Sequence, residues 1–246
     1  MKIAIGFLAA IALFAQQPGG NLDFEVVSVK PMDPALWQGG VAHMVRSLKS
    51  GYEARNLALR DLILTAYRLR PYQLVGGPNW LGTAGWDVDA KYPAGASGSD
   101  LPRMMQAMLA DRFQLVAHFE TRAASLYNLV VAKNGPRLHE AGATDSSGMS
   151  AGPRMIKYDS ASMGELANQL SSYLECEVTD RTGLSGRYTI NLSFAPVELS
   201  TSTETASDPR PTIFQAVEEQ LGLKLESAKG PVQVLVIDRA EKPSAN

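Results

Sequence analysis

The sequence predicts an α+β fold, built by tandem duplication of a small unit in which two helices pack on a mostly antiparallel sheet. Apolar residues recur at helical spacing in four stretches, and alternation of apolar and polar residues marks several strands. Both halves of the chain run through these elements in the same order. With 246 residues, of which 45% are hydrophobic, the chain is long enough to bury a core of this kind.

Matching residues in the two halves support the duplication. The matched pairs are Leu62 with Leu166, Trp86 with Tyr188, Val88 with Ile190, Gln106-Ala107 with Gln215-Ala216, and Leu129-Val130 with Leu235-Val236. Their offsets run from 102 residues (Trp86 to Tyr188) to 109 residues (Gln106 to Gln215), a drift that loops of unequal length would produce. We therefore expect two tandem α+β units of about 100 residues each.

This repeat divides the chain into segments. We expect a signal peptide at 1–15, an N-terminal strand and loop at 16–40, a first α+β repeat at 41–142, a linker at 143–153, a second α+β repeat at 154–240 and a polar tail at 241–246. The linker is rich in small and polar residues, a composition typical of connections without secondary structure.

The N-terminus has the three-part pattern of a secretory signal peptide. Lys2 supplies a positive charge, Ile3–Ala15 is an apolar run of 13 residues, and the polar stretch Gln16–Gly20 follows the expected cleavage site. The run is too short to span a bilayer comfortably. We expect a periplasmic or secreted protein with no stable membrane span after cleavage. An uncleaved N-terminal anchor is the alternative.

In the first half, alternation predicts short strands and two apolar stripes predict helices. The expected strands are 24–30, 41–48, 52–55, 74–75 and 86–90. The stripe within residues 59–67 predicts a helix that ends before Pro71. Pro102 suits the first turn of a second helix. Two further strands, 114–120 and 126–133, lie five residues apart and predict a hairpin.

In the second half, Ser162 and Glu165 have the spacing of a capping box that opens a third helix. A fourth helix begins near Pro211, and Gly222 is expected to close it in a left-handed conformation. The polar stretch 196–211 before this helix is expected to be a loop. The expected strands are 154–158, 188–194, 223–226 and 232–238, of which the last two form a hairpin.

The stretch Val178–Leu192 predicts a glycine turn that leads into an alternating strand. Gly183 and Gly186 permit the turn, and the side chain of Asp180 caps it. The motif around Ser185 only superficially resembles a nucleophile elbow, because its fifth position is an arginine and a strand follows instead of a helix. The buried face of that strand is expected to carry Tyr188, Ile190 and Leu192.

Charge and motif content exclude several classes of function. The net charge is −2 and no run of Lys or Arg occurs, so no nucleic-acid partner is expected. The chain lacks the glycine-rich motifs of nucleotide and dinucleotide sites, so no cofactor is expected. It also lacks the Ser-x-x-Lys motif of penicillin-binding enzymes.

The histidines and the cysteine give no clear site. His43, His118 and His139 do not pair at the spacing of metal ligands, so no metal is expected. Cys176 is the single cysteine, so no intramolecular disulfide can form. We interpret it as a small buried side chain, because a catalytic thiol would need a nearby base.

Two pairs of residues near a turn at Gly76-Gly77-Pro78 allow a functional interpretation. Asp87 and Asp89 share one strand face, and paired carboxylates serve acid–base catalysis in glycoside hydrolysis. A solvated face opposite Trp86 and Val88 explains the pattern as well, and we favour it. Trp80 and Trp86 have the composition of a sugar-stacking platform, but core packing of at least one of them is expected.

Five motifs resemble those of one protein family. They are Phe24–Pro31, Met108–Leu115, Leu129–Pro136, Asp180–Tyr188 and Val234–Ser244, spread over nearly the whole mature chain. The sequence is similar to the large paralogous family of uncharacterised secreted proteins abundant in soil Acidobacteria, of the Solibacter type, which carry a domain of unknown function. The resemblance implies no catalytic or binding residue. This chain departs from the family pattern at Thr189, where an acidic residue is common, and at Phe119, where a basic one is.

These observations favour a non-enzymatic extracytoplasmic binding or protein-interaction module, with an unknown protein, peptide or small ligand of the cell envelope as its partner. A duplicated unit offers a cleft between its halves or exposed sheet edges. The resemblance implies one alternative, a ligand-sensing domain working with a membrane peptidase of the antirepressor type, because related domains occur in chains with such peptidases. A cell-envelope hydrolase using Asp87 and Asp89 is the other.

Overall fold

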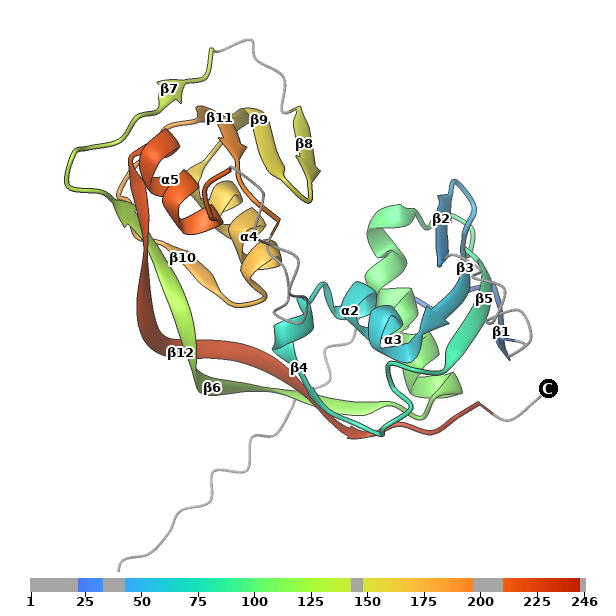
Figure 1. The fold of residues 1–246 in the computed structure, drawn as a ribbon. Helices are drawn as coiled ribbons and strands as arrows, with labels where there is room; N and C mark the ends of the chain where they lie inside the picture. Colours follow the sequence, from blue (N-terminus) through green and yellow to red (C-terminus); the bar gives the residue numbers. More distant parts are fainter. Residues whose placement is uncertain (1–21, 33–42, 143–147, 197–209, 244–246) are drawn as a thin grey trace, which may run out of the picture.

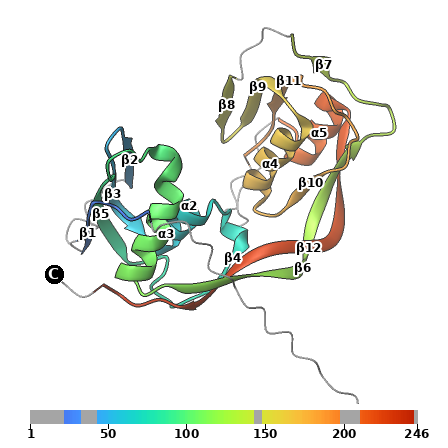
Figure 2. The same cartoon turned by 180° about the vertical axis from the view of Figure 1, so that it is seen from behind.

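Two long strands run antiparallel through the molecule and carry a lobe at each end (Figure 1). The computed structural model describes residues 22–32, 43–142, 148–196 and 210–243. Strand β6 (Val116–Val131) pairs with β12 (Leu223–Arg239) along its whole length. We call this pair the ribbon. It passes along one side of both lobes when seen from the front and from behind (Figure 2).

The ribbon shows that both predicted hairpins are wrong. The strands expected at 114–120 and 126–133 belong to one continuous strand, and so do those expected at 223–226 and 232–238. Residues 121–125 and 227–231, between the expected strands, are small or polar, which is also typical of a turn. They have this composition because most of them are exposed in the middle of the ribbon. Here Pro231 pairs with β6, and β12 has no second neighbour, so the proline is tolerated.

The first lobe is a four-stranded antiparallel sheet covered by two helices on one face (Figure 1). The strands lie in the order β1 (Val26–Pro31), β5 (Gly85–Lys91), β3 (Gly51–Ala58) and β2 (Met44–Leu48). The helices are α2 (Leu59–Tyr67) and α3 (Leu101–Arg112). Their apolar stripes share one core with the inward side chains Tyr52, Trp86 and Val88 of the sheet.

The second lobe has the same architecture. Its strands lie in the order β7 (His139–Glu140), β11 (Tyr188–Ser193), β9 (Met155–Ala161) and β8 (Met149–Gly152). Helices α4 (Met163–Leu174) and α5 (Ile213–Leu221) complete its core. Strand β8 falls within 143–153, where we expected a linker, and residues 143–147 lie outside the described residues.

A third sheet forms around the ribbon. Strand β4 (Leu74–Gly76) runs parallel to the end of β12, and β10 (Val178–Asp180) runs parallel to the end of β6. The sheet order is therefore β10-β6-β12-β4. Two short 3₁₀ turns, η1 (Pro71–Gln73) and η2 (Gly98–Asp100), precede β4 and α3. Fold class α+β is confirmed, with three mostly antiparallel sheets in the described residues.

The two lobes exchange strand ends through the ribbon. Leu235 and Ile237 of β12 are buried in the core of the first lobe. Leu129 of β6 is fully buried in the core of the second lobe. Each core is thus closed by a strand from the other half of the sequence. The two lobes depend on each other, because removing either strand end would open a buried apolar core to water.

Strand order and irregularities recur in both lobes. The β3–β5 pairing shifts register between Ala54 and Leu57. The β9–β11 pairing shifts between Tyr158 and Ala161, 104 residues later in each case. This equal placement of two bulges agrees with the repeat that residue matching predicts. The duplication as the origin of this repeat stays a prediction.

One predicted match is two residues out of register. The parallel pairings place Leu129 beside Asp180 and Ile237 beside Gly76, so Leu129 corresponds to Ile237 rather than to Leu235. A shift of two residues leaves every side chain on the same strand face. Residue types along an alternating strand therefore cannot distinguish the two alignments.

The four predicted helices are confirmed, and their ends follow local chemistry. Ser162 accepts a hydrogen bond of 3.2 Å from the Glu165 N–H at the start of α4, as expected of a capping box. Gly222 ends α5 with a left-handed φ of 63°. In the part of the chain that the structure describes, no helix has both the length and the apolar composition to cross a membrane.

Two glycines occupy positions that other residues cannot easily take. Gly183 has φ of +71° in the turn before β11. Gly222 also has a positive φ, and a side chain there would collide with the carbonyl of Gly135. The predicted role of Gly183 in the turn is thus supported by its backbone conformation.

Gly183→Val is expected to lower the free energy of unfolding by about 1–2 kcal/mol, because a β-branched residue resists the left-handed conformation. Gly222→Ala is expected to cost more, since the collision adds to the strain. Urea unfolding of the purified variants measures both. Gly82→Ala is the matched control, because Gly82 has open space around an added methyl group and lies outside the left-handed region. A Gly183→Val protein as stable as wild type would contradict the structural role of this turn.

Candidate functional site

Asp87 and Asp89 stand on the outer face of β5, and both carboxylates bind internal donors. Asp87 Oδ1 accepts a 2.9 Å hydrogen bond from the backbone N–H of Asn56, a positive-φ residue in the β3 bulge. Asp89 Oδ1 accepts a 2.6 Å bond from Arg55, and this bond raises the pKa of the Arg55 guanidinium. Val88 between them is fully buried. This geometry agrees with a polar outer face that also supports the bulge.

The two tryptophans belong to the core of the first lobe. Trp86 is only 3% exposed, and its ring meets the edge of Phe113 at a centroid distance of 5.1 Å. Trp80 packs on the same core, with its ring centroid 6.3 Å from that of Trp86. The expected core packing is confirmed for Trp86, and the pair does not form an open stacking platform.

The histidines lie on separate strands or loops. His118 Nδ1 is 2.8 Å from Asp238 Oδ2, and this hydrogen bond raises the pKa of the imidazole. His43 precedes β2, and His139 begins β7. Among the residues that the structure describes, no three potential metal ligands come together.

Cys176 lies just before β10, and Asp180 is the last residue of that strand. Burial raises the pKa of the half-buried Cys176 thiol, and the nearby Glu177 carboxylate raises it further. Both effects disfavour the reactive thiolate. Asp180 Oδ1 accepts hydrogen bonds from the N–H and the hydroxyl of Thr182, at 2.9 and 2.8 Å. The prediction that Asp180 caps the turn is therefore confirmed.

A cavity of about 360 Å³ opens at the seam between the two lobes. The first-lobe wall comes from the residues between α2 and β4, and the second-lobe wall comes from α4 and β10. Figure 2 shows β4 at the centre of the molecule, between the lobes. Charged and polar residues that line the cavity include Arg68, Arg70, Tyr72, Glu177, Thr179 and Asp180. We call it the seam pocket.

The first-lobe wall exists because α2 ends early, at Tyr67, with Arg68 in a left-handed conformation. Helix α2 has nine residues and is capped by Arg68, whereas α4 has twelve and is capped by Glu175. Proline at position 71 cannot continue the helix, because its ring clashes with the preceding turn. The chain instead crosses the seam as η1 before β4 begins. Pro71 indicates from the sequence that the helix ends here. The sequence does not indicate which residues of the other lobe the following segment contacts.

Three side chains of this crossing segment bond to other parts of the molecule. Arg70 donates to Asn168 Oδ1 at 2.8 Å and to the hydroxyl of Ser172 on α4. The Tyr72 hydroxyl donates to Glu177 Oε2 at 2.9 Å. Gln73 donates to a ribbon carbonyl. The bonds of Arg70 and Tyr72 tie the two lobes together beside the pocket, and that of Gln73 ties the segment to the ribbon.

The second-lobe wall is fixed by a buried serine. Ser171 is 3% exposed and donates to the carbonyl of Ala167 one turn earlier in α4, at 3.0 Å. Its hydroxyl also accepts the backbone N–H of Val178 at 2.9 Å, which ties β10 to the helix. Glu177, just before β10, and Asp180, the last residue of β10, therefore lie on either side of an anchored residue.

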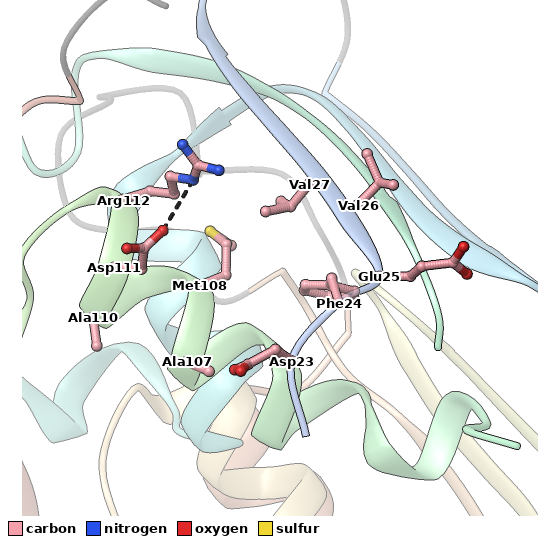
Figure 3. Close-up of a pocket in the computed structure, with 10 residues that line it drawn as sticks. All are labelled: Asp23, Phe24, Glu25, Val26, Val27, Ala107, Met108, Ala110, Asp111 and Arg112. Carbon is pink, nitrogen blue, oxygen red and sulfur yellow. Dashed lines mark ion pairs between the residues drawn. The ribbon is translucent and has the colours of Figure 1, made fainter. Parts of the chain in front are cut away.

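Two further hollows recur at equivalent places in the lobes. One, of about 760 Å³, lies between the chain around Phe24 and the end of α3, where Asp111 pairs with Arg112 at 3.1 Å (Figure 3). The other, of about 600 Å³, lies between residues 132–137 and α5. Because hollows occur at equivalent places in both lobes, we attribute them to the shared topology and not to a binding function. The seam pocket is lined by the segment after α2, where the two halves differ because α2 has nine residues and α4 has twelve.

Tyr72→Phe is expected to lower the free energy of unfolding at pH 7 by about 1–2 kcal/mol, the contribution of a hydrogen bond to a charged acceptor. Burial, and then Glu177, raise the pKa of Tyr72 above its ordinary value of 10. The folded state therefore holds this proton more tightly than the unfolded state does. The stability difference should persist up to about pH 10 and vanish as the pH rises through the pKa of folded Tyr72.

Urea unfolding of wild type and variant between pH 7 and pH 11 measures this difference. Tyr67→Phe is the control, because the hydroxyl of half-buried Tyr67 bonds to no described residue. Its effect at pH 7 is expected to stay within about 0.5 kcal/mol. Equal losses for the two variants would contradict the role of the Tyr72–Glu177 bond.

Comparison with known proteins places this architecture in one family. No curated protein and no solved structure matches the chain. A family described as "Protein of unknown function (DUF3738)" matches residues 60–240, which include both helices of each lobe except the first residue of α2. The match covers well over half of the sequence, and the chain therefore belongs to the DUF3738 family.

Proposed function

We propose that the protein is a non-enzymatic extracytoplasmic binding module whose ligand site is the seam pocket. The observation that carries this proposal is a polar cavity lined by both lobes at the seam between them. Ligand sites in proteins occur preferentially at such junctions, where side chains from two rigid bodies converge. The cross-lobe bonds of Arg70 and Tyr72 hold the two walls in place before a ligand arrives.

Export from the cytoplasm is part of the same proposal. It is supported by the positive charge, the apolar run and the polar stretch of residues 1–20. The similarity of five motifs to the secreted acidobacterial family points in the same direction.

A sensing role with a membrane peptidase is the second candidate. The observation that favours it is that Arg70 and Tyr72 both line the pocket and bridge the lobes. A ligand that competes for these groups would change how the lobes are held, and a partner could detect that change. The pocket would then sense its ligand and pass a conformational change to the partner, and would not only bind the ligand.

Thermal-shift screening of the full chain against small polar compounds tests the binding proposal. A ligand present at 100 times its dissociation constant adds about 2.7 kcal/mol to the stability of the folded state. We expect at least one compound to raise the melting temperature of wild type, and Thr179→Tyr to abolish that rise by filling the pocket. Thr189→Tyr is the matched control, since Thr189 is exposed on β11, away from the pocket.

A stabilising compound that acts equally on Thr179→Tyr would place its site elsewhere and contradict the proposal. The hydrolase alternative is tested with the same protein on ester, glycoside and peptide substrates. We expect no turnover. Hydrolysis that disappears in Asp87→Asn and persists in Thr179→Tyr would favour the hydrolase instead.

A further inference from the structure

We propose that the ligand of the seam pocket is a zwitterion, a molecule that carries both a carboxylate and a protonated amine, such as a free amino acid or a short peptide. This inference rests on the proposed function and adds the chemical class of the ligand. It depends on how the charged groups of the pocket are already engaged with the rest of the protein.

Arg68 supplies the group for the ligand carboxylate. It is exposed at the end of α2, where its left-handed backbone, with φ of 54°, is held by hydrogen bonds from its N–H to the carbonyls of Leu64 and Thr65. No described residue forms an ion pair or a side-chain hydrogen bond with its guanidinium. Arg70 also keeps its charge, because its partners Asn168 and Ser172 are neutral, but its guanidinium has fewer N–H groups left for a ligand. A free guanidinium binds a carboxylate through two parallel hydrogen bonds.

Glu177 and Asp180 supply the groups for the ligand amine. Glu177 Oε2 accepts from Tyr72, and Asp180 Oδ1 accepts from Thr182. Among the described residues, nothing donates to the second oxygen of either carboxylate. Their protein donors are neutral hydroxyl and amide groups, so the negative charge of each carboxylate is not cancelled by a salt bridge. Such carboxylates attract an ammonium group.

The charge balance of the pocket favours a ligand with both signs. The lining has two arginines and two carboxylates, Glu177 and Asp180, so its formal charge is zero. A ligand with only a carboxylate would leave both pocket carboxylates without a cation from the ligand. A ligand with only an amine would leave Arg68 without an anion. A zwitterion pairs both ends and keeps the site neutral, which limits the cost of desolvation.

The remaining walls limit the size of the ligand. Gln73 is satisfied, because its side chain donates to the ribbon and accepts from the Arg70 N–H. Gly164 and Ala167 present little side chain from α4. The volume of about 360 Å³ lies at the lower end of the range for small-molecule sites. An amino acid or a dipeptide fits this size class.

Calorimetric titration of the full chain with alanylalanine, together with thermal shifts for a panel of free amino acids and alanyl dipeptides, tests the proposal. Two blocked compounds are the matched ligands: N-acetyl-alanylalanine lacks the amine charge, and alanylalanine amide lacks the carboxylate. We expect the free zwitterions to bind and each blocked compound to bind at least tenfold more weakly.

Single substitutions test which side chain binds the carboxylate of the ligand and which binds its amine. Arg68→Gln is expected to weaken zwitterion binding at least tenfold and to leave binding of the amide unchanged. Glu177→Gln, which can still accept from Tyr72, is expected to weaken zwitterion binding and to leave the N-acetyl compound unchanged. Arg103→Gln is the control, because Arg103 is exposed on α3, outside the pocket, and pairs with no described residue.

Equal binding of free and blocked compounds would overturn the zwitterion assignment, and so would a panel in which no zwitterion binds. If another compound then binds in a way that Thr179→Tyr abolishes, the binding function stands and only the ligand class is wrong. If zwitterions bind equally to wild type, Arg68→Gln and Thr179→Tyr, the seam pocket is not the site and both proposals fail.

Discussion

The exchange of strand ends through the ribbon is the constraint on which the rest of this structure depends. Each lobe has a sheet and two helices of its own, but its core also needs a strand end from the other half of the chain. Leu235 and Ile237 close the first core, and Leu129 closes the second. Since burying such side chains contributes about 1.5–3 kcal/mol each, neither lobe is complete without its counterpart.

This exchange explains which parts of the fold the sequence could predict. Helices and short strands depend on local periodicity and caps, and all four helices lie where the apolar stripes and the Ser162–Glu165 box indicate. The ribbon depends on pairing between residues about 100 positions apart. Its middle, with Ala123 against Pro231, has the composition of a turn, so local rules predict hairpins there.

The candidate site was harder to predict for the same reason. Single residues were interpreted correctly where their partners are close in sequence, as Asp180 with Thr182 shows. Arg70, Tyr72 and Glu177 belong to no motif, and they meet only because the ribbon brings two distant segments to one seam. Pro71 was visible as the end of a helix, but a helix stop does not reveal what the released residues will touch.

A repeated architecture also shows where to look for function. Features present in both lobes, such as the paired bulges and the hollows beside α3 and α5, follow from the shared topology. The crossing segment after α2 breaks this correspondence, because α4 continues for three more residues than α2 does. The segment that follows this early stop brings Arg70 and Tyr72 into contact with the opposite lobe and places Arg68 in the lining of the pocket. A ligand bound there would touch both lobes at once, because the pocket is lined by residues of each.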